Sequence, residues 1–327
     1  MYPDQGRDPV HPAGGAPAAK PRRWRNQCTY TGKADDHWAI RSAERPLNHA
    51  RAPLEMTGVG GMTAVVTGAS SGIGRAIAVE LARRGTTVIA VARRTDPLQA
   101  TVERCRRRAP GSQAVVADVS MRSECKRVVT EAVRQVGRID ILVNNAGVGL
   151  HKQAADTTVE DIEHVMQTNF FGAVHMTSAV LPPMLERRHG HIINVTSVAG
   201  HLPLPEESAY CASKAALSAW TQSLALDLAS SGVHVGELSP GPIDTEIWQK
   251  ASAEYPGHLY PPRVIAVAVA KMLEEKIAFM TVPRRFGAPG AVYPLLSRPM
   301  RWGLQTFSTH RTPSAILGAL ASAITGR

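Results

Sequence analysis

The sequence predicts an α/β protein built on a doubly wound parallel sheet. From Met62 onward, short apolar strands alternate with amphipathic helical segments. Strands separated by helices of this length pair in parallel, and right-handed crossovers place helices on both faces of the sheet. The first strand also runs into a glycine-rich turn and a helix, at the carboxyl edge where such sheets bind ligands.

Each element is expected from its own pattern. The strands are short runs rich in β-branched and other apolar residues, expected at residues 63–67, 86–91, 114–117, 139–143, 191–195, 233–238 and 278–282. The helices carry apolar residues three or four positions apart, and are expected at residues 73–84, 96–108, 121–136, 159–186, 208–230 and 264–275. Together they predict a single domain.

Two segments flank this domain. Residues 1–61 contain a Pro-Ala-Gly-Gly-Ala-Pro stretch and no sustained apolar period, so we expect a disordered N-terminal arm. Met56 and Met62 are candidate starts of translation. Residues 283–302, in a basic amphipathic C-terminal tail, mix cations with large apolar groups. They are expected to make peripheral contact with an anionic membrane, to pack on another subunit, or to cover their own domain.

Charge and cysteine content narrow the class of protein. The net charge of +10 divides into +3 for residues 1–61, zero for 62–249 and +7 for 250–327. A nucleic-acid enzyme spreads its positive charge along the binding face, so no nucleic-acid partner is expected. The four cysteines lack disulfide or zinc-ligand spacing, and no apolar run reaches the roughly 18 residues of a membrane span. We expect a cytoplasmic protein without a metal.

The turn after the first strand reads Thr67-Gly-Ala-Ser-Ser-Gly-Ile-Gly74. Glycines let the backbone approach a pyrophosphate, and the following helix offers it unpaired N–H groups. The G-x-x-x-G-x-G spacing departs from the common dinucleotide fingerprint. A tight turn without a ligand is the alternative.

Four motifs together resemble the classical short-chain dehydrogenase/reductase family. They are TGASSGIG at 67–74, NNAG at 144–147, Tyr-x-x-x-Lys at 210–214 and SPGPIDT at 239–245. The resemblance covers about residues 62–250. It implies a Rossmann-like catalytic domain, which we expect at residues 62–265 and to bind NADP, while residues 266–327 match no family motif and are expected to form a C-terminal substrate-side or tail segment. It also implies a homo-oligomer formed through the helices around 160–186 and 208–230.

The end of the second strand favours NADP over NAD. In dinucleotide folds an acid here bonds the ribose 2′-hydroxyl, whereas an arginine accommodates a 2′-phosphate. This chain has Ala92 and then Arg93, although the arginines at 93 and 94 could simply be solvated. The resemblance makes Asp118 an adenine contact, with an N-cap for the helix at 121–136 as the alternative. The resemblance and the turn together predict the cofactor-binding residues Gly68, Ser70, Ser71, Gly72, Ile73, Gly74, Arg93, Asp118, Val119, Asn145, Ala146, Gly147, Tyr210, Lys214, Pro240, Gly241, Ile243 and Thr245.

Tyr210 and Lys214 lie one helical turn apart, so both side chains share a face. A phenol has a pKa of about 10, and an ammonium at about 4 Å would favour the phenolate by on the order of 4 kcal/mol. The resemblance implies that Tyr210 is the acid/base, that Lys214 also binds the nicotinamide ribose, that Ser197 steadies the substrate oxygen and that Asn169 holds a relay water. Taken singly, a surface pair, a cap and a local backbone contact are the alternatives.

These expectations describe an oxidoreductase that transfers a hydride between NADP(H) and a small carbonyl/alcohol substrate. The segments Val148–Leu150, His201–Leu204 and 247–260 should wall the substrate pocket, and their mostly apolar residues favour a lipophilic substrate. His201 is a possible substrate contact or an exposed loop residue. A reductase of acyl-chain ketones and a non-catalytic NADP-binding regulator are the alternatives.

Overall fold

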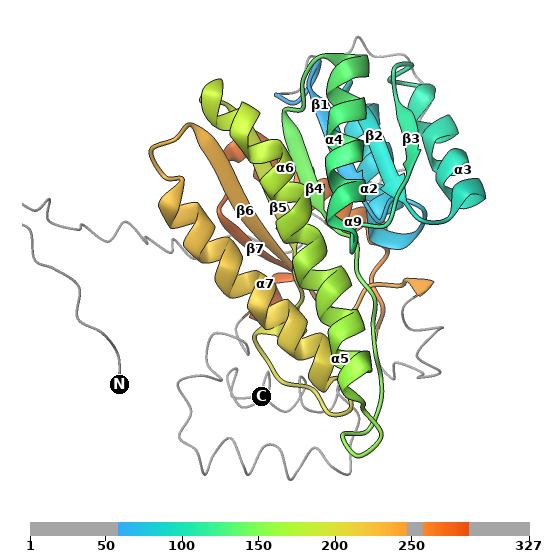
Figure 1. Ribbon diagram of the computed structural model, residues 1–327, viewed down its shortest axis with the longest axis vertical. Helices are drawn as coiled ribbons and strands as arrows, with labels where there is room; N and C mark the ends of the chain where they lie inside the picture. Colours follow the sequence, from blue (N-terminus) through green and yellow to red (C-terminus); the bar gives the residue numbers. More distant parts are fainter. Residues whose placement is uncertain (1–57, 247–257, 288–327) are drawn as a thin grey trace, which may run out of the picture. The chain divides into compact units, whose positions relative to one another are not determined.

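The computed structural model describes residues 58–246 and 258–287 of the 327-residue chain. Within these ranges, seven parallel strands form one sheet in the order β3-β2-β1-β4-β5-β6-β7 (Figure 1). The strands are β1 Thr63–Thr67, β2 Thr87–Ala92, β3 Gln113–Val116, β4 Ile141–Asn144, β5 Gly190–Val195, β6 Val233–Pro240 and β7 Phe279–Val282. The chain order reverses at β1, which lies beside both β2 and β4. This confirms the predicted doubly wound sheet.

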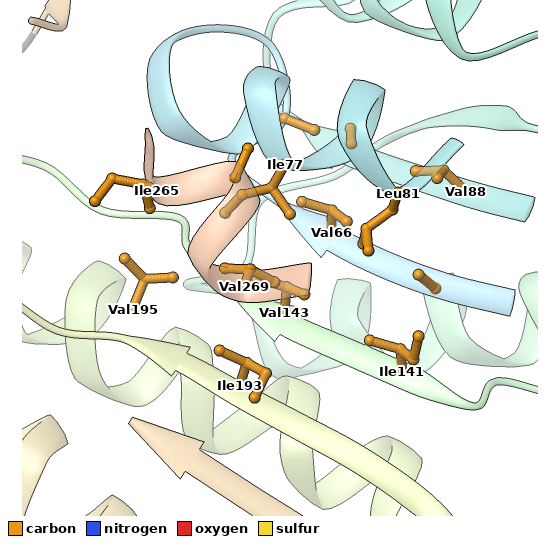
Figure 2. Packing of buried hydrophobic residues seen from close by; sticks show 14 of the residues in the cluster. Val66, Ile77, Leu81, Val88, Ile141, Val143, Ile193, Val195, Ile265 and Val269 are labelled. Atoms are coloured by element: carbon orange, nitrogen blue, oxygen red, sulfur yellow. The ribbon is translucent and has the colours of Figure 1, made fainter. Parts of the chain in front are cut away.

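Helices cover both faces of the sheet. They are α2 Gly72–Arg83, α3 Thr95–Arg106, α4 Arg122–Val136, α5 Val159–Met166, α6 Gly172–Glu186, α7 Ser208–Asp227 and α9 Pro262–Glu275. Successive strand residues point to opposite faces. Val66 of β1 therefore packs with Ile77 of α2 and Val269 of α9 (Figure 2), whereas Val65 packs with Val128 of α4 and Met176 of α6. Each fully buried aliphatic side chain of this kind contributes about 1.5–3 kcal/mol.

The predicted helix at 159–186 is not one continuous α-helix. A π-helical segment, η1 Gln167–Phe171, separates α5 from α6. Asn169 lies in it, 1% exposed, and hydrogen-bonds the backbone of Val148 in the segment after β4. Helical periodicity does not reveal such a bulge, because the bulge depends on a partner 21 residues away.

The ends of the expected domain also differ from the structure. Residues 58–61, expected in the disordered arm, are held in place: Thr86 Oγ1 donates to the Val59 carbonyl at 2.8 Å, and Val59 is buried. The boundary expected at residue 265 falls within α9, and β7 beyond it pairs with β6. The rest of the N-terminal arm and the tail after residue 287 lie outside the described residues.

Parallel strands bring their carboxyl ends to one edge of the sheet. Thr67, Ala92, Asn144, Val195 and Pro240 end five strands at this edge. The glycine turn, the NNAG motif and the SPGPIDT motif lie at the ends of β1, β4 and β6, and Tyr210 and Lys214 lie in the first two turns of α7. The fold gathers these motifs at the switch in strand order, where open α/β sheets bind ligands.

Candidate active site

The β1–α2 turn forms one wall of a cleft. Gly68 has a φ of +68°, and a Cβ there would lie 2.8 Å from the Ala146 Cα. A Cβ on Gly74 would collide with the Gly68 carbonyl. Both positions therefore require glycine. The Ser71 side chain makes no cap bond at the start of α2, which leaves the first N–H groups of the helix available to an anion.

A cavity of about 510 Å³ opens at this edge of the sheet. It is lined by Gly68, Ser70, Ser71, Gly72, Ile73, Gly74, Arg93, Asp118, Val119, Asn145, Ala146, Gly147, Pro240, Gly241, Ile243 and Thr245, and by Ser197, Tyr210 and Lys214. These are all of the residues expected to bind the dinucleotide and three of the four expected catalytic residues. Asn169 is not among the residues that line it.

Two arginines follow β2 at the outer end of the cavity. Arg93 Nη1 lies 3.6 Å from Asp118 Oδ2. Arg94, which the sequence prediction did not select, donates to Ser71 Oγ at 2.9 Å and Ser70 Oγ at 3.3 Å, and pairs with Glu246 at 2.9 Å. The Arg-Arg dipeptide was the only signal for it. A glycine turn, an open helix N-terminus and two guanidinium groups form a donor set suited to a pyrophosphate and a further phosphate.

Asp118 does not cap α4. Its Oδ1 accepts from Ser120 N at 2.9 Å, and α4 starts only at Arg122 with Met121 before it. Burial raises the pKa of Asp118, but the bonds to Ser120 and Arg93 outweigh burial and lower it below its usual value. Asp118 is therefore an ionised group at the cavity wall.

Lys214 is buried beneath the cavity. It is 4% exposed, and its Nζ donates to the Val195 carbonyl at 3.0 Å and lies 5.9 Å from the centre of the Tyr210 ring. A Cβ on Gly147 would approach this Nζ to 3.6 Å. The alternative of a solvated surface pair does not hold for these two residues.

Burial dominates the proton affinities of Tyr210 and Lys214. It raises the pKa of Tyr210 above its ordinary value, a nearby Ser197 hydroxyl lowers it in part, and the charges of Glu207 and Cys211 raise it further. Burial also lowers the pKa of Lys214 to about 8. The expected attraction to Lys214 does not outweigh the loss of solvent, so the phenol remains protonated at neutral pH.

Ser197 has two contacts. It follows β5, and its Oγ accepts from Ala199 N at 3.1 Å, capping the short 3₁₀ helix η2 Val198–Gly200. It is also within hydrogen-bonding reach of the Tyr210 hydroxyl. Its role as a cap is thus compatible with a position beside the phenol.

Asn169 joins the segment after β4 to α7. Its Oδ1 accepts from Val148 N at 2.7 Å, and its Nδ2 donates to the Val148 carbonyl at 2.9 Å and to Ser213 Oγ at 3.0 Å. Ser213 Oγ in turn donates to the Tyr210 carbonyl at 2.8 Å. These contacts cross between elements, unlike the local backbone contact that was the alternative.

The asparagines of the NNAG motif fasten the middle of the sheet. Asn144 Nδ2 donates to Asn194 Oδ1 at 2.8 Å, and Asn194 Nδ2 donates to Thr221 Oγ1 at 2.8 Å. Asn145 Nδ2 donates to the Thr67 carbonyl at 2.9 Å. The segment after β4 is therefore fixed against the glycine turn.

The substrate end of the cavity differs in part from the prediction. Val148, Gly149, Leu150 and Leu204 line it, but His201 does not. His201 Nε2 instead lies 3.1 Å from Glu237 Oε1, a buried carboxylate on β6. The cavity is also lined by polar residues that were not selected from the sequence, His151, His164 and Glu207. Of the expected wall at 247–260, residues 247–257 lie outside the described residues.

In the ranges 58–246 and 258–287, no helix has the length and apolar character needed to cross a membrane.

Comparisons with known proteins match this architecture. The chain is 40% identical over 182 residues to an uncharacterized oxidoreductase of Staphylococcus epidermidis, covering 56% of this chain and 78% of that protein. It is 33% identical over 224 residues to the ketoacyl reductase HetN of Nostoc, and the match covers 68% of this chain and 78% of that protein. It is 40% identical over 200 residues to an 11-beta-hydroxysteroid dehydrogenase-like protein of Arabidopsis thaliana, and the match covers 61% of this chain and 66% of that protein.

Solved structures agree. A short chain dehydrogenase/reductase from Burkholderia phymatum in complex with NAD has a TM-score of 0.67 at 26% identity, covering 72% of this chain and 93% of that one. An alcohol dehydrogenase from Thermococcus sibiricus complexed with 5-hydroxy-NADP has a TM-score of 0.61 at 26% identity, and the match covers 67% of this chain and 95% of that one.

The family model for short chain dehydrogenases matches residues 62–256. With the doubly wound sheet and the cleft at its carboxyl edge, this match shows that the chain belongs to the short-chain dehydrogenase/reductase family of nicotinamide-dependent oxidoreductases.

Proposed function

We propose that this protein is an NADP(H)-preferring oxidoreductase that interconverts a small-molecule ketone and its alcohol, with Tyr210 as the acid/base. The observation that carries the proposal is the meeting of Tyr210, Ser197 and Lys214 in the same cavity as the glycine turn. A bound nicotinamide supplies or accepts the hydride at the substrate carbon. The chain's own residues must then manage the proton on the substrate oxygen.

Tyr210 donates this proton in the reducing direction. Its hydroxyl is protonated at neutral pH, so Tyr210 can act as the proton donor, although burial makes it a weaker acid than a free phenol. Ser197, beside that hydroxyl, hydrogen-bonds the same substrate oxygen as negative charge develops on it. The Lys214 ammonium stabilises the phenolate that remains. Asn169 fixes Val148 and the first turn of α7, and we assign the family's water relay to its neighbourhood.

The NADP preference rests on the groups after β2. Ala92 offers no carboxylate to a ribose 2′-hydroxyl, and Arg93 and Arg94 both line the cavity. Among the solved structures described above, one was obtained with NAD and one with an NADP derivative. The family alone therefore leaves the preference open, and the two arginines favour NADP.

The substrate is proposed to be largely apolar around its reacting carbon, because Val148, Leu150, Val198 and Leu204 line that end of the cavity. Similarity to a ketoacyl reductase keeps acyl-chain ketones as a second candidate. A nucleotide-binding regulator without turnover would not need Ser197, Tyr210 and Lys214 to meet in the cavity.

A homo-oligomer belongs to the same proposal. Phe171, beside α6, and Leu226, on α7, are 42% and 70% exposed, on the helices expected to form the subunit interface. We also retain a cytoplasmic location and a C-terminal segment that completes the substrate side. The proposed membrane contact involves residues that lie mostly outside the described ranges.

Steady-state oxidation of NADPH against a panel of ketones tests the activity. Tyr210→Phe should lower kcat by about 10²–10⁴-fold while leaving NADPH binding within about threefold, because it removes only the acid. Tyr260→Phe is the matched control, since Tyr260 is buried but does not line the cavity, and it should retain wild-type turnover. Equal rates for wild type and Tyr210→Phe would refute the assignment.

A further inference from the structure

Glu207 is a buried acid at the substrate end of the cavity. It precedes α7 at the N-cap position, is 9% exposed and lines the cavity. An N-cap side chain can accept from the first N–H groups of its helix, a role that Asp, Asn, Ser and Thr usually fill. The Glu207 side chain makes no such bond, so its carboxyl group is not used to start the helix.

Glu207 differs from the other acids that line the cavity. Asp118 accepts from Ser120, Asp161 binds Lys152 at 2.7 Å, and Glu246 pairs with Arg94 at 2.9 Å. In the ranges 58–246 and 258–287, the basic side chain found within 4.0 Å of the Glu207 carboxyl group is the His151 imidazole, whose Nδ1 lies 3.9 Å from Glu207 Oε1. That distance exceeds a hydrogen bond.

His151 is itself engaged elsewhere. Its Nε2 lies 2.7 Å from Glu206 Oε2, which is on a neighbouring acid that does not line the cavity. Burying a carboxyl group without a donor is unfavourable. Burial accordingly raises the pKa of Glu207 to about 7. A chain that keeps such a group beside its acid/base gains from it when a ligand supplies the missing partner.

We propose that the Glu207 carboxyl group hydrogen-bonds a hydroxyl group that the substrate carries near its reacting carbonyl, so that the preferred substrate is a hydroxyketone or, in reverse, a diol. A hydroxyl fits because it donates to an ionised carboxylate and accepts from a protonated one. This inference rests on the proposed action of Tyr210 at the carbonyl.

The position of Glu207 limits where the hydroxyl can be. Glu207 comes three positions before Tyr210, a rise of on the order of 5 Å along the helix. The substrate hydroxyl therefore lies a few bonds from the carbonyl carbon of the substrate. The neighbouring wall is apolar, with Val148, Leu150 and Leu204. Sites that hydrogen-bond a substrate hydroxyl discriminate strongly against analogues without it, because their own polar group is then unpaired.

Matched ketones of one carbon skeleton, with and without a hydroxyl two or three bonds from the carbonyl, test the inference with NADPH at saturation. Wild type should prefer the hydroxyketone in kcat/KM by about tenfold or more. Glu207→Leu should abolish this preference by raising KM for the hydroxyketone, with the parent ketone within about threefold. Glu207→Gln, whose amide both donates and accepts, should keep part of it.

Glu163→Gln is the matched control and should behave as wild type, because Glu163 on α5 is exposed and does not line the cavity. Preference unchanged in Glu207→Leu, or an equal loss on both ketones, would overturn the inference, even where turnover supports the proposed function. If wild type reduces neither ketone, the proposed function fails. The inference is then decided by titrating the hydroxyketone into the enzyme–NADPH complex and following NADPH fluorescence: weaker binding by Glu207→Leu supports it, and equal binding contradicts it.

Discussion

At the scale of single residues, desolvation decides the chemistry of the cavity. Tyr210 and Lys214 both shift toward their neutral forms, with the pKa of Lys214 near 8. The sequence shows that the pair is one turn apart, but the depth of burial comes only from the packing of Lys214 under Val195. Motif spacing therefore identifies the reacting groups without giving their protonation states.

The arginines after β2 give a prediction about cofactor choice. Arg94→Gln should raise the Kd for NADPH by about 10- to 100-fold and leave that for NADH within about threefold, because a 2′-phosphate contact is lost. Arg127→Gln is the control, since Arg127 lies on α4, pairs with Glu124 and does not line the cavity. Equal weakening of both cofactors, measured by fluorescence titration, would count against the phosphate contact.

Substitution of Glu246 should have the opposite effect on NADPH binding to substitution of Arg94. Its carboxylate pairs with Arg94 at 2.9 Å and therefore competes with a phosphate for the same guanidinium. Glu246→Gln should tighten NADPH binding by about 2- to 10-fold, as expected for a partly exposed pair. The same titration checks this result, and weaker NADPH binding would indicate that Glu246 positions Arg94 instead.

At the scale of elements, strand and helix positions follow from the sequence, whereas their interruptions do not. The strand β1 begins and ends where its apolar run does. The π-helix η1 was not predictable, because its Asn169 bonds Val148 across a tertiary contact. Glu207 was not predictable for a similar reason: only the folded chain shows that its side chain makes no cap bond and lines the cavity.

The glycine turn gives a prediction at this scale. Gly74→Ala should lower the free energy of unfolding by about 2 kcal/mol or more and weaken NADPH binding, because its Cβ would collide with the Gly68 carbonyl. Gly111→Ala is the matched control, since its Cβ would meet only Thr87 at 3.5 Å. Urea unfolding measures both. A Gly74→Ala protein as stable as the control would show that the turn yields easily.

At the scale of the whole molecule, the candidate active site lies at the carboxyl ends of the strands, whereas a group that makes the stability of the fold depend on pH lies near their amino ends. At the start of β5, His191 is 5% exposed and lies 5.8 Å, ring to ring, from His234. Among residues 58–246 and 258–287, neither His191 Nδ1 nor His234 Nε2 has a hydrogen-bond partner. Burial lowers the pKa of His191 to about 4, helped by His234, His189 and Lys276 and opposed by Asp140.

This burial should make the fold acid-labile. The unfolded chain binds a proton at His191 near its ordinary pKa of 6.5, whereas the folded chain does so only near 4. Stability is therefore lost as the pH falls from 6.5 toward 4, by about 3 kcal/mol. His191→Asn should flatten this slope in urea titrations between pH 7 and pH 4.5, and His164→Gln, an exposed histidine, should not. An unchanged slope in His191→Asn would rule out this group as the cause.

The central claim is that hydride transfer and proton donation by Tyr210 occur together in this cavity. The direct measurement uses NADPH deuterated at the transferable position of nicotinamide C4, with mass spectrometry of the alcohol formed. Wild type should yield alcohol with one deuterium on the carbinol carbon, and Tyr210→Phe should bind the same cofactor yet form about 10²-fold less product or lower. Tight NADPH binding without deuterated alcohol from any of the ketones, or undiminished transfer by Tyr210→Phe, would contradict the account.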